Sequence, residues 1–150
     1  MVSFFMSEFN YLILLVGLNP LPPTIMAQYF LLKQNSIKTI YFICSIHTEQ
    51  NKEIGTKKYA EKIKDYLRRT FPLRKINLIC FCIALKNVGN PKEVRDVITT
   101  LLQQLPTGDS VHLDYTGGTG VMQSQSYILL SEWHKNNQSS KVSFSYLDAR

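Results

Sequence analysis

Short apolar runs alternate with longer amphipathic segments along the whole chain, and this alternation limits the possible folds more than any other feature. The apolar runs predict five β-strands, over residues 11–16, 39–44, 76–83, 111–115 and 142–147. Between them, helical spacing of apolar residues covers about 24–35, 52–69 and 91–105, and the stretch from 120 to about 135. A strand–helix repeat of this kind builds a mostly parallel sheet with helices on both faces. We therefore predict an α/β fold with three layers.

The ends of the predicted elements carry local signals. Asn90 is a good N-cap, and Pro91 suits the first position of the helix that follows. In the first helix Thr24 can act as the cap, because the two prolines before it disfavour an earlier start. The strand at 76–83 is continuously apolar, which predicts that both of its faces are covered.

The chain is long enough for one domain and shows no division into two. Its 150 residues are 45% hydrophobic, and a chain of this size buries roughly 70% of its unfolded surface. Neither an internal repeat nor a low-complexity linker is present. We predict a single domain over 1–150. Because the sequence ends close after its last strand, the domain could also be part of a longer effector protein.

The apolar amino terminus and the cysteines both favour a cytoplasmic protein. The run at 11–16 is far shorter than the roughly 20 residues of a membrane span, and no basic segment precedes it. We interpret it as a buried first strand and expect no membrane partner. Cys44, Cys80 and Cys82 lie in or beside apolar runs, and an odd number without a disulfide framework fits a reducing compartment. We expect buried free thiols and no metal site.

The charge of the chain favours an anionic partner. The net charge is +6, and much of the positive charge lies on the predicted helix at 52–69. For these residues, however, a solvated helix face is the explanation that we favour over a binding surface. Because neither a helix-turn-helix partner nor an aromatic stacking platform can be recognised, we expect no direct DNA binding.

A glycine-rich turn lies between the fourth predicted strand and the last predicted helix. It reads Asp114-Tyr115-Thr116-Gly117-Gly118-Thr119-Gly120. Main-chain N–H groups converge at a helix start, where the helix dipole and the unpaired donors favour an anion. Thr116 and Thr119 add hydroxyls that can donate to phosphate or ribose oxygens. The loop at 17–23 is not a dinucleotide fingerprint, and the chain has no Gly-Lys-Ser/Thr of an ATP-binding P-loop. For the glycine-rich turn itself, a purely structural strand-to-helix turn is the alternative.

Two further loops belong to the same edge of the predicted sheet, because ligands of such sheets bind beyond the carboxyl ends of the strands. One loop follows the first strand and contains Leu18, Asn19 and Pro20; the other follows the second strand and contains Ser45, His47 and Thr48. Around the turn, Asp114 is expected to orient the backbone, and Tyr115 could stack on a base or belong to the core. His112, inside a strand, is expected to be a satisfied core histidine. No catalytic pair or triad is defined by spacing.

These motifs resemble those of CARF domains, the CRISPR-associated Rossmann-fold sensors. The resemblance rests on the turn Asp114–Thr119 followed by Met122, on the Asn19-Pro20 loop, and on the basic segment Lys57-Lys58-Tyr59-Ala60-Glu61-Lys62-Ile63. It extends over essentially the whole chain and implies a Rossmann-like fold. It also implies a homodimer that binds a cyclic oligoadenylate, the second messenger of type III CRISPR defence, across its two-fold interface and that switches an effector. Such an effector could follow Arg150.

The resemblance implies a set of ligand-binding residues, without catalytic residues, metal or cofactor. They are Leu18, Asn19, Pro20, Ser45, His47, Thr48, Asp114, Tyr115, Thr116, Gly117, Gly118, Thr119, Gly120, Met122 and Gln123.

One position departs from the pattern of this family. The family motif commonly ends in lysine where this chain has Gly120, and that lysine is associated with phosphate contact and with cleavage of the ring. A sensor for cyclic tetra-adenylate is therefore the first hypothesis, with ring size open. A metal-independent ring nuclease is the second, disfavoured by Gly120. Another nucleotide-binding module of Rossmann-like fold is the third.

Overall fold

Strands and helices alternate along the computed structural model, which describes residues 7–46, 55–84 and 89–147. The elements in chain order are β1 (Tyr11–Leu15), α1 (Leu21–Lys33), β2 (Thr39–Ile46), α2 (Lys57–Thr70), β3 (Asn77–Ala84), α3 (Pro91–Gln103), β4 (Val111–Asp114), α4 (Gly120–Asn136) and β5 (Val142–Ser145). Every predicted strand and helix is present, with ends that differ by a few residues.

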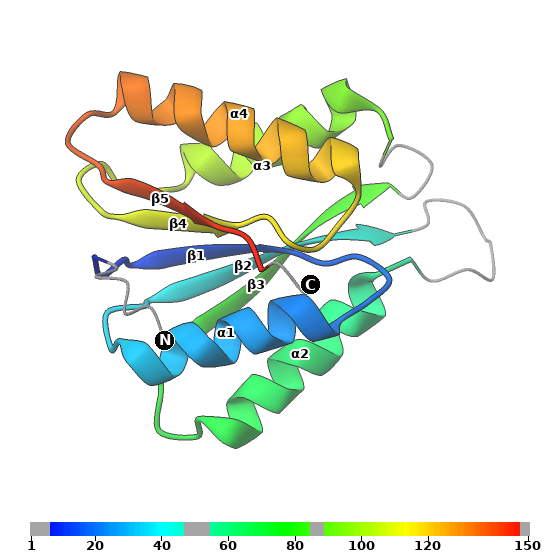
Figure 1. Cartoon of the computed structure of the whole chain (residues 1–150), viewed down its shortest axis with the longest axis vertical. Helices are drawn as coiled ribbons and strands as arrows, with labels where there is room; N and C mark the ends of the chain where they lie inside the picture. Colours follow the sequence, from blue (N-terminus) through cyan, green and yellow to red (C-terminus); the bar gives the residue numbers. More distant parts are fainter. Residues whose placement is uncertain (1–6, 47–54, 85–88, 148–150) are drawn as a thin grey trace.

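The strands form one sheet in the order β3-β2-β1-β4-β5, and each neighbouring pair is parallel. Helices α1 and α2 cover one face of the sheet, and α3 and α4 cover the other (Figure 1). The predicted α/β fold is therefore confirmed as a Rossmann-like arrangement of three layers.

The core consists of two apolar layers, one on each side of the sheet. Strand β1 is buried along its whole length, and its alternate residues enter different layers. Leu12 and Leu14 pack with residues of α1 and α2, whereas Ile13 and Leu15 pack with residues of α3 and α4. A central parallel strand must be apolar on both faces for this reason.

Two predictions about single elements are wrong. Strand β3 is half-exposed along most of its length, because it lies at the edge of the sheet. The strands whose two faces are both covered along their length are β1 and β2 instead.

Helix α1 begins at Leu21, so Thr24 is not its cap. Prolines are tolerated in a first turn, whose N–H groups have no helical partner. The Thr24 hydroxyl instead donates to the Pro20 carbonyl at 2.6 Å. The prediction for Asn90 is confirmed, since its side chain accepts from the Lys92 N–H.

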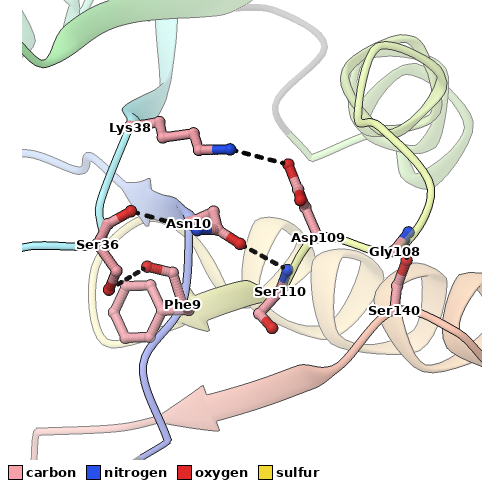
Figure 2. A network of polar contacts seen from close by, with 8 residues as sticks. All are labelled: Phe9, Asn10, Ser36, Lys38, Gly108, Asp109, Ser110 and Ser140. Carbon is pink, nitrogen blue, oxygen red and sulfur yellow. Dashed lines mark hydrogen bonds and ion pairs between the residues drawn. The ribbon is translucent and has the colours of Figure 1, made fainter.

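A polar network closes the amino-terminal edge of the sheet (Figure 2). The Asn10 side chain accepts from the Ser110 N–H at 3.1 Å and donates to the Ser36 carbonyl at 3.3 Å, so it joins the start of β1 to two loops. The Lys38 ammonium lies 3.5 Å from the Asp109 carboxylate beside it. These contacts join the starts of the strands to their preceding loops, whereas the loops of the candidate site lie at the opposite, carboxyl-terminal edge.

No helix within the described ranges is both long and apolar enough to cross a membrane.

Candidate functional site

Two loops contact each other at the carboxyl-terminal edge, where the strand order changes direction beside β1. The chain leaves β1 toward β2 on one side, and β4 lies on the other side. Such a switch point is the usual ligand crevice of an open parallel sheet. A Cβ atom placed on Gly17 would lie 3.0 Å from the Gly118 nitrogen, and one on Gly117 would overlap the Leu15 carbonyl oxygen. The two loops are therefore in backbone contact, which only glycine permits here.

The glycine turn ends at the capped start of α4. Gly118 has a φ of +78°, a conformation that other residues rarely adopt. Thr119 is the N-cap of α4, and its Oγ1 accepts from the Met122 N–H at 3.2 Å. Helix α4 then begins at Gly120, so its first N–H groups lie at the crevice. This is the geometry that favours an anion.

Hydrogen bonds with Asp114, Gln123 and Leu147 hold the turn in place. Asp114 Oδ1 accepts from the Thr116 N–H at 3.1 Å. The Gln123 amide donates to the carbonyls of Thr116 and Gly117, at 3.1 Å and 3.2 Å. The Leu147 N–H donates to Thr116 Oγ1 at 2.7 Å. The backbone of the turn is thus ordered before any ligand binds, which reduces the entropy lost on binding.

A buried hydrogen-bond chain supports Asp114 from below. Ser145 Oγ donates to Asp114 Oδ2 at 2.6 Å and lies 2.7 Å from His112 Nε2. Because a hydroxyl has one proton, His112 must donate from Nε2, and its Nδ1 accepts from Ser143 Oγ at 2.7 Å. The imidazole also stacks on Phe9, with ring centroids 4.7 Å apart. The prediction of a satisfied core histidine is confirmed.

Burial shifts the pKa of both titratable residues in this hydrogen-bond chain, His112 and Asp114. Desolvation lowers the pKa of His112 to about 4, because the imidazolium would lose its water. Desolvation also raises the pKa of Asp114, and the hydrogen bonds from Ser145 and Thr116 act against that rise. At neutral pH His112 is therefore neutral. It belongs to the support of the turn and does not reach a ligand, since it is fully buried.

A shallow cavity of about 380 Å³, largely open to solvent, lies beside the first turns of α4. It is lined by Tyr115, Gly120, Gln123, Ser124, Tyr127 and Ile128. The Tyr115 and Tyr127 rings form an edge-to-face pair with centroids 5.7 Å apart. A volume in the range of roughly 300–1,000 Å³ is typical of small-molecule sites. The cavity combines aromatic surface with a helix N-terminus, which suits a planar group attached to an anion.

Some of the predicted ligand residues lie elsewhere or have another role. Ser45 is buried, and its hydroxyl lies 3.1 Å from Thr56 Oγ1 and accepts from the Thr56 N–H, so its side chain is engaged within the protein. Asp114 and Met122 are likewise buried and act from beneath the turn. His47 and Thr48 lie outside the described residues.

The remaining predicted residues are at the edge. Leu18 is exposed, the Asn19 side chain accepts from the Leu21 N–H at 3.1 Å, and Pro20 precedes α1. Tyr115, Gln123 and the residues 116–120 surround the start of α4.

Sequence reasoning missed three residues of the cavity, namely Ser124, Tyr127 and Ile128. The spacing of residues along a helix could have identified these three positions, because they share a face of α4 with Gly120 and Gln123. Ser124 and Ile128 lie one and two turns after Gly120, and Tyr127 lies one turn after Gln123.

Within the ranges that the structure describes, His, Cys, Asp and Glu side chains do not gather into a group that could hold a metal ion.

Neither a protein-family model nor a curated protein matches this chain, so the interpretation of the site depends on its own residues and contacts.

Proposed function

We propose that this domain binds a cyclic oligoadenylate, with cyclic tetra-adenylate as the expected ring, and that it does so as a homodimer that controls an effector. The observation that carries the proposal is the position of the capped N-terminus of α4 directly beside the tyrosine-lined cavity. A nucleotide needs these two surfaces next to each other, one for the phosphate and one for the base.

The phosphate would lie against the first N–H groups of α4. The turn before α4 presents these donors, and hydrogen bonds to the Asp114 and Gln123 side chains fix its backbone. Backbone donors at a helix start bind a phosphate without any charged side chain. The net charge of +6 assists the approach of a polyanion over longer distance.

The adenine base would enter the cavity and stack on Tyr115 or Tyr127. Tyr127 is 45% exposed, so its ring is accessible to a ligand. The Ser124 hydroxyl and the Gln123 amide line the same cavity and supply polar groups for the edge of the base. Stacking on an aromatic ring contributes roughly 1–3 kcal/mol per base.

The dimer is proposed from the symmetry of the ligand and from exposed apolar residues at the same edge. Leu18 and Leu21 are 81% and 59% exposed at the start of α1. A two-fold axis over the edge would bring two phosphate sites and two cavities to one symmetric ring. It would also cover these leucines.

Binding is favoured over cleavage of the ring. Among the described residues, those that line the cavity are tyrosines, glycine, glutamine, serine and isoleucine, so its lining includes no carboxylate, histidine or lysine. A ring nuclease would need a group that stabilises the charge developing on the phosphate.

Calorimetric titration with cyclic tetra-adenylate tests this function. Cyclic hexa-adenylate and linear tetra-adenylate serve as controls, and chromatography of the recovered ligand detects cleavage. We expect one ring per two chains and intact ligand. Loss of the stacking surface in Tyr127→Ala should weaken binding about 10-fold to 100-fold. Tyr29→Ala is the matched control, because Tyr29 is similarly exposed, at 42%, but lies on α1. If neither ring binds the folded protein, the proposal is wrong.

Gly120→Lys should strengthen binding of the ring. A Cβ atom on Gly120 would meet no other atom within 4 Å, so a longer side chain fits without moving the backbone. A charge-assisted hydrogen bond contributes roughly 1.5–3 kcal/mol, so affinity should rise about tenfold at low salt and less at high salt. Gly120→Gln, of similar length and without charge, is the control. Equal affinities of the two variants across a salt series would place the phosphate away from this helix start.

A further inference from the structure

The three cysteines converge on one face of the sheet, on neighbouring strands. Cys44 lies in β2, and Cys80 and Cys82 lie in β3. All three are free thiols, as predicted, but only Cys44 is buried, because β3 is an edge strand. The Sγ atoms of Cys44 and Cys82 are 3.5 Å apart. This cluster has no part in the nucleotide site described above.

The backbone places one of these pairs within reach of a disulfide bond. The parallel register puts Cys44 opposite Cys82, whereas Cys80 is opposite Phe42. Neighbouring strands are about 4.7–4.9 Å apart, and disulfides join Cα atoms about 4.4–6.8 Å apart. The two sulfurs therefore need to approach by roughly 1.5 Å to reach the S–S bond length, which side-chain rotation can supply.

The surroundings divide the two thiols into an attacking and a resolving group. The hydrogen bond from Cys44 and the nearby Lys57 lower the pKa of Cys82 to about 7, although burial acts in the opposite direction. Hydrogen bonding to Cys80 and Cys82, together with burial, raises the pKa of Cys44. Lys64 of α2 also lowers the pKa of Cys82, whereas Glu61 raises it. The hydrogen bond from Cys44 lowers the pKa of Cys80 as well, and Glu61 accepts from Cys80 Sγ at 3.7 Å. The strand register, which places Cys82 and not Cys80 opposite Cys44, therefore selects Cys82 as the partner. A half-exposed thiolate beside a buried thiol is the arrangement of a reactive pair.

We propose that Cys44 and Cys82 form an oxidant-reactive pair, which hydrogen peroxide converts into a disulfide between β2 and β3. The Cys82 thiolate attacks a peroxide oxygen, the O–O bond breaks, and the leaving hydroxide takes a proton to become water. Cys82 is then a sulfenic acid. The Cys44 sulfur attacks it, the S–O bond breaks, and the leaving hydroxide takes the Cys44 proton as a second water. Two thiols and one peroxide thus give one disulfide and two waters, and a dithiol reductant reverses the change.

The disulfide would attach the exposed edge strand to the centre of the sheet. Its two cysteines are 38 positions apart, and β3 is held at one side only. Closing a loop of this size restricts the unfolded chain. Oxidation should raise the Tm by on the order of 5–10 °C.

Mass spectrometry of the whole chain after mild oxidation tests the pair. The folded protein is treated with hydrogen peroxide, remaining thiols are alkylated, and the digest is examined without reduction. We expect one cross-linked peptide pair that joins Cys44 to Cys82, an alkylated Cys80, and loss of the cross-link with dithiothreitol.

Two variants separate the proposed pair from its neighbour. Cys80→Ser should keep the cross-link and the rise in Tm, whereas Cys82→Ser should lose both. A cross-link to Cys80 or between two chains would overturn the proposal. Three alkylated thiols, or Cys82 oxidised to a sulfinic acid without a cross-link, would do so as well. Because the wild-type digest is decisive by itself, a variant that fails to fold leaves the test intact.

Discussion

Gly117→Ala is expected to lower the free energy of unfolding by about 3 kcal/mol or more. A loss of this size lies toward the upper end of the range found for single substitutions. The added Cβ atom would overlap the carbonyl oxygen of Leu15, the last residue of β1. That oxygen belongs to the backbone of a fully buried strand, so it cannot move aside as a flexible side chain can. The turn and β1 must separate, and the start of α4 should be displaced with the turn. Urea denaturation followed by circular dichroism measures the loss.

Gly120→Ala is the matched control for this prediction. It makes the same chemical change three residues later, at a position where a Cβ atom meets nothing within 4 Å. Alanine is favoured over glycine inside a helix by up to about 1 kcal/mol, so this variant should be as stable as the wild type or slightly more stable. Equal stability of the two variants would show that the loop and β1 are not in the close contact described here.

Acid is expected to destabilise the fold through His112. The pKa of this histidine is about 4 when folded, against a normal value of 6.5. Between these values the unfolded chain binds a proton that the folded chain does not, so stability falls as pH decreases from 6.5 toward 4. His112 alone should remove about 2 kcal/mol between pH 7 and pH 4.5. Asp114 acts in the opposite direction, because its raised pKa lets the folded chain take up a proton first.

Denaturation curves of wild type and His112→Phe over this pH range isolate the contribution of the histidine. Phenylalanine keeps an aromatic ring against those of Phe9 and Phe30 but does not titrate. The variant should be less stable at pH 7, since Ser143 and Ser145 lose their partner, but its stability should depend less on pH. If both proteins show the same pH dependence, the buried His112 is not the acid-sensitive group.

Local patterns predicted those parts of the site that are contiguous in the chain. The residues Asp114–Gly120 combine a strand end, a glycine turn and a helix cap within a few positions, so their roles follow from turn and capping chemistry. Asp114 was expected to orient the turn, and its hydrogen bond to the Thr116 N–H confirms this. The helical period would also have placed Tyr127 on the same face of α4 as Gln123, four positions earlier.

Parts of the site that depend on distant residues could not be predicted. Ser45 was expected near the ligand because it ends a strand at the correct edge, but its hydroxyl is engaged by Thr56, which precedes α2. The partners of His112 come from β5, 31 and 33 positions away. No pattern within β4 indicates them. The contact between Gly17 and Gly118 likewise joins two loops from opposite ends of the chain.

The sequence by itself determined the order of strands and helices, the α/β class and the helix cap at Asn90. Each of these depends on interactions between residues a few positions apart, and hydrophobic period and capping chemistry record those interactions directly. Only the tertiary structure decided that β3 is an edge strand, that Cys44 faces Cys82, and that His112 supports the glycine turn. These depend on the order of strands in the sheet, and strands of equal hydrophobicity can be ordered in several ways until their packing selects one.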